Sequence, residues 1–187
     1  MSVDIWPLLR DEEVLNTPVF SVRRHTCRSP KDGGDKNFFI LDARDWAQVI
    51  AVTADEQVVL VRQFRQGSRE LSLELPGGVV EKGQTPLEAA QRELREETGY
   101  TSNQWSKLTS FLPNPAIQTN TAHLFLAENA CLTDKTEFDE NEDLELVTVP
   151  ASQLGSLVND GGINHVVMAA GILYYLQRCR EDDRPDR

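Results

Sequence analysis

The segment from Gly77 to Tyr100 constrains the fold more than any other part of the chain. Its second half carries the signals of both ends of a helix. Residues 85–88, Thr-Pro-Leu-Glu, form a capping box with proline at the first helical position, and Gly99 stands where a C-terminal cap belongs. Between these ends, residues at helical spacing form one mostly apolar side that should face a core: Leu87, Ala90, Gln91, Leu94 and Thr98.

Three carboxylates, Glu93, Glu96 and Glu97, crowd the last turns of this helix. Glu93 and Glu97 project only ~40° apart around the helix axis. Like charges at this spacing repel by roughly 0.2–0.5 kcal/mol, and the helix dipole disfavours anions near its C-terminal end. A hard divalent cation such as Mg²⁺ would resolve the conflict, because it prefers carboxylate and phosphate oxygens. Helix physics alone leaves open a solvated face that Arg92 and Arg95 partly neutralise.

The same residues resemble the signature of the Nudix family, G-x5-E-x7-R-E-U-x-E-E-x-G-U, in which U is a bulky aliphatic residue. The matching positions are Gly78, Arg92, Glu93, Leu94, Glu96, Glu97 and Gly99. Two positions depart from the signature: Gln84 stands where it has its isolated glutamate, and Tyr100 is bulky but not aliphatic. The resemblance implies that the isolated glutamate is peripheral to the other carboxylates, so we expect activity to be retained.

Residues 1–45 are expected to form an N-terminal β arm, ahead of a catalytic domain that covers residues 46–187. Within the arm, residues 19–22 and 38–41 are typical of strands, and the turn-rich residues 29–34 separate them. An isolated hairpin is marginal in water, so this arm needs a partner. The partner is either its own catalytic domain or a second subunit.

The pattern of the remaining chain predicts strands on both sides of the signature helix and two helices near the C-terminus. The expected strands cover residues 48–53, 58–61, 105–112, 122–127 and 144–149, and the helices cover 151–158 and about 164–179. Arg62 and Arg65 follow the second strand. Because arginine binds phosphate through two parallel N–H groups, both are candidates for substrate contact. Solvated charges at the end of a strand are the alternative.

Length, composition and charge indicate which class of protein this is and which partners it can bind. The chain has 187 residues, of which 40% are hydrophobic, as expected for one soluble globular domain with an appended arm. Its net charge of −11 argues against a nucleic-acid partner. No apolar run approaches the ~18 residues of a membrane span, and the N-terminus lacks a signal peptide. Three scattered cysteines, Cys27, Cys131 and Cys179, predict free thiols in a reducing cytoplasm.

Beyond the signature, the chain is similar to the ADP-ribose and nucleotide-sugar pyrophosphatase branch of the Nudix family. The shared features are the β arm, residues 61–65 (VRQFR), residues 74–78 (ELPGG) and residues 140–150 (ENEDLELVTVP). One stretch departs, since residues 114–120 lack the glycine and glutamate of that branch's Ser-Pro-Gly-x-x-x-Glu. The resemblance implies an α+β fold, the Nudix α/β/α sandwich with a mixed sheet and an N-terminal β arm. It also implies a homodimer in which the arms are exchanged or packed together.

The branch's metal ligands match Glu93, Glu96, Glu97 and a backbone carbonyl at Gly77, and its substrate arginine matches Arg65. The implied cofactor is Mg²⁺, with Mn²⁺ as the alternative. The implied reaction hydrolyses a nucleoside diphosphate linked to another group, with ADP-ribose or a related nucleotide sugar as the leading substrate. The products would be a nucleoside monophosphate and a sugar phosphate.

A base for this reaction is expected on the acidic loop before residue 144, because a loop that closes over substrate can reach water without being a metal ligand. Glu142 is the preferred base and Glu140 the second, while Arg92 is counted among the catalytic residues. Two other readings stay open. One is hydrolysis of nucleoside triphosphates or dinucleoside polyphosphates. The other is a Nudix module that senses a nucleotide without cleaving it, which only Gln84 favours.

Overall fold

The structure is a computed structural model that describes residues 3–138 and 143–182 of the chain. The chain divides into two compact units. Met1–Arg44 and Leu112–Thr121 form the first, which we call the arm unit, and Asp45–Phe111 and Ala122–Arg187 form the second, the catalytic unit. Each is described separately.

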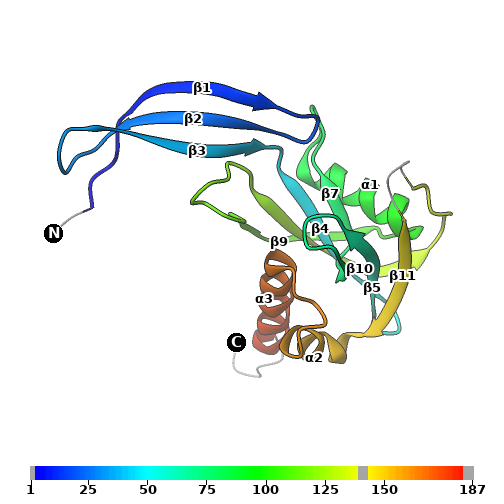
Figure 1. Ribbon diagram of the computed structural model, residues 1–187. Coiled ribbons are helices and arrows are strands. Elements are labelled where there is room, and N and C mark those ends of the chain that lie inside the picture. The colour runs from blue at the N-terminus through cyan, green and yellow to red at the C-terminus, as the bar shows by residue number, and fades with distance from the viewer. Residues whose placement is uncertain (1–2, 139–142, 183–187) are drawn as a thin grey trace. The chain divides into compact units, whose positions relative to one another are not determined.

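The arm unit is a three-stranded antiparallel sheet in the order β1-β2-β3 (Figure 1). Its strands are β1 (Leu8–Asn16), β2 (Phe20–Arg28) and β3 (Asp35–Ala43). The sequence pattern predicted only two short strands here, because charged residues interrupt the apolar alternation of β1. Those charges form cross-strand ion pairs, such as Arg23 with Asp11 at 2.8 Å and Arg24 with Glu12 at 3.0 Å. Residues 112–121 join this unit through the hydrogen bond from the Leu41 N–H to the Ile117 carbonyl, 2.7 Å.

The catalytic unit is built on a mixed sheet whose central order is β11-β5-β4-β10-β8. Strands β4 (Trp46–Thr53) and β10 (Ala122–Leu132) run parallel, and the other neighbours are antiparallel. The remaining strands of this sheet are β5 (Gln57–Arg65), β6 (Glu70–Glu74), β7 (Gly77–Val79), β8 (Tyr100–Thr101), β9 (Gln104–Phe111) and β11 (Leu144–Pro150). The helices are α1 (Pro86–Thr98), η1 (Ala151–Gln153), α2 (Leu154–Asn159) and α3 (Val166–Asp182).

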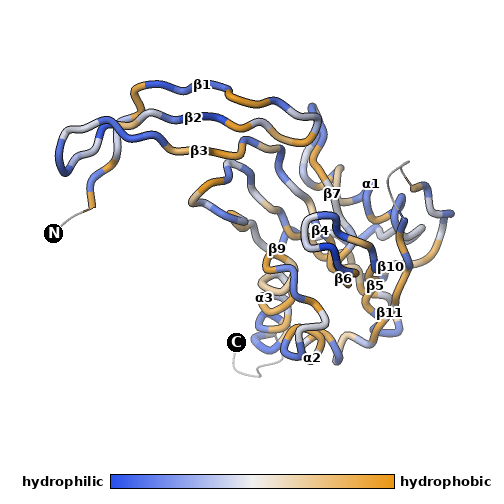
Figure 2. Tube along the Cα trace, viewed as in Figure 1, coloured by the Kyte–Doolittle hydropathy of each residue, from blue (hydrophilic) through white to orange (hydrophobic). Residues whose placement is uncertain are grey.

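Helices cover both faces of this sheet, so the central strands are buried on both sides. Val49 of β4 and Leu94 of α1 belong to one core cluster, whereas Ile50 of β4 and Ile172 of α3 belong to the other. Because successive side chains of a strand point to opposite faces, β4 contributes to both clusters. This explains the apolar residues 49–52 on its two faces; the hydropathy along the chain is drawn in Figure 2. The predicted α/β/α sandwich is confirmed.

Helix α1 has the ends that its sequence predicts. The Thr85 side chain accepts a hydrogen bond from the Glu88 N–H at 3.2 Å, and the Glu88 carboxylate accepts one from the Thr85 N–H at 2.7 Å. Gly99 adopts the left-handed conformation, with φ of 72°, at the C-terminal end. The capping box and the glycine cap are therefore both confirmed. Within the described ranges, no helix is long and apolar enough to cross a bilayer.

Candidate active site

The carboxylates of α1 pack against the strand that precedes the helix. Glu93 and Glu97 are only 7% and 4% exposed. The Gly77 N–H donates a hydrogen bond to Glu97 Oε2 at 2.8 Å, and a Cβ at Gly78 would collide with the Glu93 carboxylate. Glycine is required at position 77 as well, since its φ is 154° and a Cβ there would collide with backbone of β4. The two glycines thus let β7 approach both carboxylates closely.

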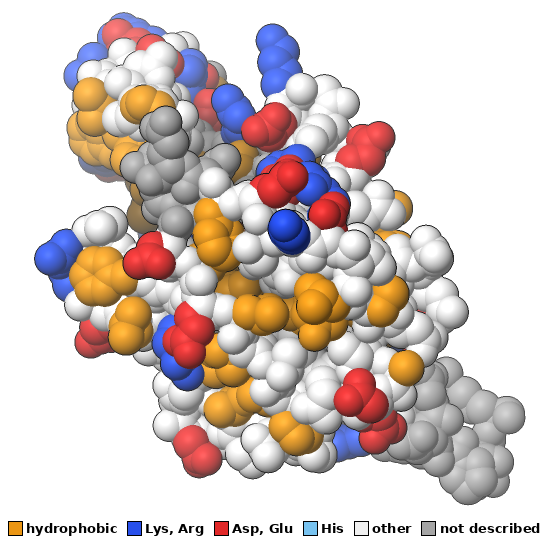
Figure 3. Space-filling view, turned by 90° about the vertical axis from the view of Figure 1, so that its right-hand side faces the viewer, with side chains coloured by type: hydrophobic (Ala, Val, Ile, Leu, Met, Phe, Trp, Pro, Cys, Tyr) orange, Lys and Arg blue, Asp and Glu red, His pale blue; other side chains and the backbone are white. Residues whose placement is uncertain are grey.

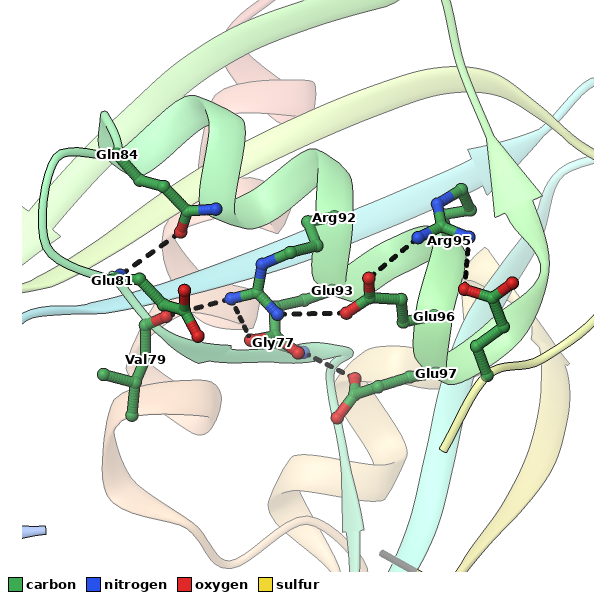
Figure 4. Close-up of polar contacts among 10 residues, drawn as sticks. Gly77, Val79, Glu81, Gln84, Arg92, Glu93, Arg95, Glu96 and Glu97 are labelled. Carbon is green, nitrogen blue, oxygen red and sulfur yellow. Dashed lines mark hydrogen bonds and ion pairs between the residues drawn. The ribbon is translucent and has the colours of Figure 1, made fainter. Parts of the chain in front are cut away.

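Arg92 and Arg95 provide counter-charge for Glu93 and Glu96 (Figure 4). Arg92 contacts Glu93 Oε1 at 2.8 Å and Glu96 Oε2 at 3.0 Å, and it also donates to the Val79 carbonyl at 3.2 Å. Arg95 contacts the other oxygen of Glu96 at 2.7 Å. Burial opposes the charge of Arg92, yet the two carboxylates beside it hold its pKa above the ordinary value.

The chemistry of this cluster suits a hard divalent cation. Carboxylate oxygens beside a close backbone approach are the kind of ligand that Mg²⁺ takes. Among the residues that the structure describes, no three His, Cys, Asp or Glu side chains converge as a metal site, and Glu93 and Glu96 are paired with arginines. Arg92 Nε is buried without a hydrogen-bond partner in the same described set. A bound cation would take over counter-charge that Arg92 and Arg95 supply.

A cavity of about 630 Å³ lies beside Gly77 and Gly78. Its walls come from β4, β5, β6, β7 and the residues just before α3, and they include Trp46, Gln48, Ser72 and His165. Arg65 and Glu74 also line it and form a two-point ion pair with N–O distances of 2.8 and 2.5 Å. Of the two predicted substrate arginines, the structure places Arg65 in this cavity wall. Arg62 instead contacts Glu145 of β11 at 2.8 Å.

The two predicted base residues, Glu140 and Glu142, lie outside the described residues. The segment just before them packs on the end of α1. The Glu137 N–H donates to the Glu96 carbonyl at 2.8 Å, and its carboxylate accepts from Arg95 at 2.9 Å. Gln84 closes the turn before α1 by accepting a hydrogen bond from the Glu81 N–H at 3.2 Å (Figure 4).

Sequence reasoning missed the ion pair of Glu74 with Arg65 and the link between Arg95 and Glu137. A signal for Glu74 was present, because it alternates with leucines in residues 71–75 and therefore shares one strand face with Ser72. Nothing local marks the Arg95 contact, since its partner lies far along the chain.

Comparison with known proteins identifies the family and several relatives of this chain. The model of the family described as NUDIX domain matches residues 44–167. An ADP-ribose pyrophosphatase of Bacillus subtilis (strain 168) is 37% identical over 127 residues, which cover 67% of this chain and 69% of that protein. A GDP-mannose pyrophosphatase of Pectobacterium atrosepticum is 30% identical over 161 residues, 80% of each chain.

Among solved structures, a crystal structure of ADP compounds hydrolase superposes with a TM-score of 0.86. The match covers 98% of this chain and 99% of that one, at 21% sequence identity. At this identity the likeness bears on the fold, which it supports along nearly the whole chain.

Proposed function

The chain belongs to the Nudix family, and on that premise we propose that it is a pyrophosphohydrolase of nucleoside diphosphates linked to another group. The observation that carries this proposal is that a carboxylate of α1 and Arg65 lie at the same cavity. Glu97 accepts a hydrogen bond from Gly77, and Gly77 lines the same cavity as Arg65. ADP-ribose or a related nucleotide sugar is the leading substrate, in line with the names of the relatives. The products are a nucleoside monophosphate and a sugar phosphate.

Glu93, Glu96, Glu97 and the Gly77 carbonyl would hold the cation, Mg²⁺ or alternatively Mn²⁺. When bound, it supplies Lewis-acid activation of the phosphorus and stabilises the leaving oxygen. Arg65 binds the diphosphate from the cavity wall, because a guanidinium matches phosphate oxygens in a forked geometry. Arg62 stays a weaker candidate, since in the structure it binds Glu145.

The base that activates water is assigned to Glu142, with Glu140 as the second choice. The described residues that flank residues 139–142 have defined positions. Glu137 is hydrogen-bonded to α1, and β11 begins at Leu144. Arg92 orients Glu93 and Glu96 by bonding to both.

We propose a homodimer formed through the arm unit. The register of β1, β2 and β3 places Leu15, Phe20 and Phe39 on one face of the sheet. These side chains are 53%, 37% and 60% exposed, and the same face also carries the ion pair of Arg24 with Glu12. A second copy of the chain would bury these three apolar side chains, because apolar residues grouped on an exposed face typically mark an interaction surface. Cys27, Cys131 and Cys179 are all free thiols, which is consistent with a cytoplasmic protein.

We expect no nucleic-acid partner. On the face drawn in Figure 3, basic side chains that the structure describes lie beside acidic ones rather than in a continuous basic patch. Together with the net charge of −11, this gives little counterion release on binding a polyanion.

The test is a substrate panel with Mg²⁺, in which products are identified. It contains ADP-ribose, nucleotide sugars, nucleoside triphosphates and dinucleoside polyphosphates. The proposal expects the fastest hydrolysis with ADP-ribose or a nucleotide sugar, giving a nucleoside monophosphate. Preference for a triphosphate would support the second enzymatic reading, and tight binding without any turnover would support the sensor.

A further inference from the structure

Glu74 of β6 has no exposed side-chain surface and is the most deeply buried charged group among the described residues. Its Oε1 accepts a hydrogen bond from Arg65 Nε at 2.8 Å, and its Oε2 accepts from Arg65 Nη2 at 2.5 Å. Gln63 Nε2 donates to Oε2 at 3.3 Å. Burial alone would raise the pKa of Glu74, but the hydrogen bonds from Arg65 and Ser72 outweigh burial and hold that pKa below its usual value. The buried group is thus an anion.

The stability of the fold alone does not explain why position 74 carries a buried carboxylate. Burial removes the charge of Glu74 from water, and a well-packed apolar side chain often stabilises a fold as well as a buried ionic group or better. The cross-strand neighbour of Glu74 is Val61, which is fully buried, so an apolar side chain at position 74 would have an apolar partner. Moreover, a carboxylate in the wall of a cavity that receives a diphosphate repels that ligand. The carboxylate needs a role that offsets this repulsion.

The partner of Glu74 supplies such a role. The Arg65 side chain is 44% exposed and lines the cavity, so it has surface available to a ligand. Two parallel bonds to one carboxylate fix the plane of its guanidinium, not only its position. The second arginine of β5 provides a contrast. Arg62 meets Glu145 with both side chains exposed, at 41% and 63%, and such surface pairs are weakly held.

We propose that Glu74 is a positioning residue, which fixes the Arg65 guanidinium in the cavity wall in the orientation that receives the diphosphate. The inference rests on the proposed function. Arginine has many rotamers, and the freedom it loses on gripping a ligand weakens binding. In this protein that freedom is already lost before substrate arrives, because Glu74 and its partners hold the side chain.

A double-mutant cycle tests this. Glu74→Gln keeps the shape but removes the charge that orients Arg65, so we expect kcat/KM to fall about tenfold, mainly through a higher KM. Arg65→Gln should lower it further. If Glu74 acts through Arg65, kcat/KM of the double variant should match that of Arg65→Gln within about twofold. Once Arg65 is absent, removing the charge of Glu74 should have no further effect. Glu145→Gln is the matched control, because it removes the carboxylate partner of Arg62, the other arginine of β5. This variant should leave KM nearly unchanged.

Two outcomes would overturn the proposal. Independent, multiplying losses in the double variant would mean that Glu74 does not act through Arg65. A lower KM for Glu74→Gln would mean that its charge only repels substrate. Should Glu74→Gln not fold, Glu74→Asp replaces it in the cycle, because it keeps the charge and withdraws it by one methylene.

The same cycle is measured by equilibrium binding of α,β-methylene ADP-ribose, which cannot be hydrolysed at its diphosphate. If the wild-type chain binds this analogue and shows coupling between positions 65 and 74 but hydrolyses no substrate, the proposed function fails while the inference stands. If the chain neither binds nor hydrolyses, both fail. If it hydrolyses and no coupling appears in either readout, only the inference fails.

Discussion

Arg62 and Arg65 show how side-chain direction separates residues that look equivalent in sequence. They lie three positions apart on β5, so they leave the strand on opposite faces. Arg65 enters the cavity wall with Glu74, and Arg62 meets Glu145 of the neighbouring strand. Strand alternation alone could have predicted the separation, but not which face holds the cavity.

The base assignment is tested by paired substitutions at positions 140 and 142. Glu142→Gln should lower kcat by about 10²–10⁴-fold, the usual contribution of a general base, while Mg²⁺ dependence and KM stay nearly constant. Glu140→Gln should have a much smaller effect. Steady-state kinetics at saturating Mg²⁺ measures both. A loss only at Glu140 would keep the loop and reassign the residue, and full activity in both variants would contradict a base on this loop.

Glu74 also gives the protein a predictable response to acid. The pKa of Glu74 in the folded chain is lower than that of an ordinary carboxyl group. Ionised Glu74 therefore stabilises the folded state at pH values above its pKa in the unfolded chain. That stability is lost as the pH falls through the lowered, folded-state pKa. Urea unfolding of wild type and Glu74→Gln should therefore show a clear gap at pH 7 that narrows toward pH 3. An equal gap at both pH values would contradict the assignment of an ionised Glu74.

The candidate site could be predicted only where its residues are close in sequence. The α1 glutamates and Gly77 fall within one segment, and the structure brings Glu97 and Gly77 into contact as that segment suggests. Glu74 was missed because its partner Arg65 lies on another strand. The link from Arg95 to Glu137 spans 42 positions and leaves no local pattern.

At the scale of elements, the N-terminal cap of α1 should matter for stability more than for chemistry. Thr85→Ala removes the hydroxyl that accepts from the Glu88 N–H, which costs about 1 kcal/mol. For a chain of this size, Tm should then fall by roughly 2–4 °C. Calorimetry on the holoprotein checks the shift, with kcat measured below the transition. An unchanged Tm, or a loss of turnover without a change in Tm, would contradict a purely structural cap.

The first and last residues of helix α1 could be predicted because the signals for its ends are local in the sequence. The ends of the strands were less predictable. β10 was expected at residues 122–127 but continues to Leu132, where it pairs with β8. The expected start of the last helix, near residue 164, was also early, since α3 begins at Val166. Ends of this kind depend on pairing and packing with distant residues, which periodicity does not contain.

For the whole molecule, the open face of the arm unit predicts association. Sedimentation should give twice the 21.0 kDa chain mass at micromolar concentration. Phe39→Asp places a charge on the exposed apolar face and should shift the protein to monomer without unfolding the arm, whereas Lys36→Gln, on the opposite face of β3, should not. A wild-type chain that sediments as a monomer would contradict the dimer.

The architecture of the catalytic unit followed from the sequence, but the extent of the arm unit did not. Residues 112–121 follow β9 in the chain yet hydrogen-bond to β3, 76 positions away in the case of Leu41 and Ile117. Residues 8–16 carry charges where strands usually alternate apolar and polar, and cross-strand ion pairs make this tolerable.

The central claim is that the α1 carboxylates form the catalytic metal site, and one comparison tests it most directly. Glu97→Gln and Glu88→Gln make the same chemical change at opposite ends of one helix, and glutamine is tolerated in a capping box. With ADP-ribose and Mg²⁺, the account predicts that Glu97→Gln loses most turnover while its stability is unchanged or rises slightly, because repulsion with Glu93 is relieved. Glu88→Gln should keep turnover within about twofold. A fully active Glu97→Gln enzyme would contradict the account.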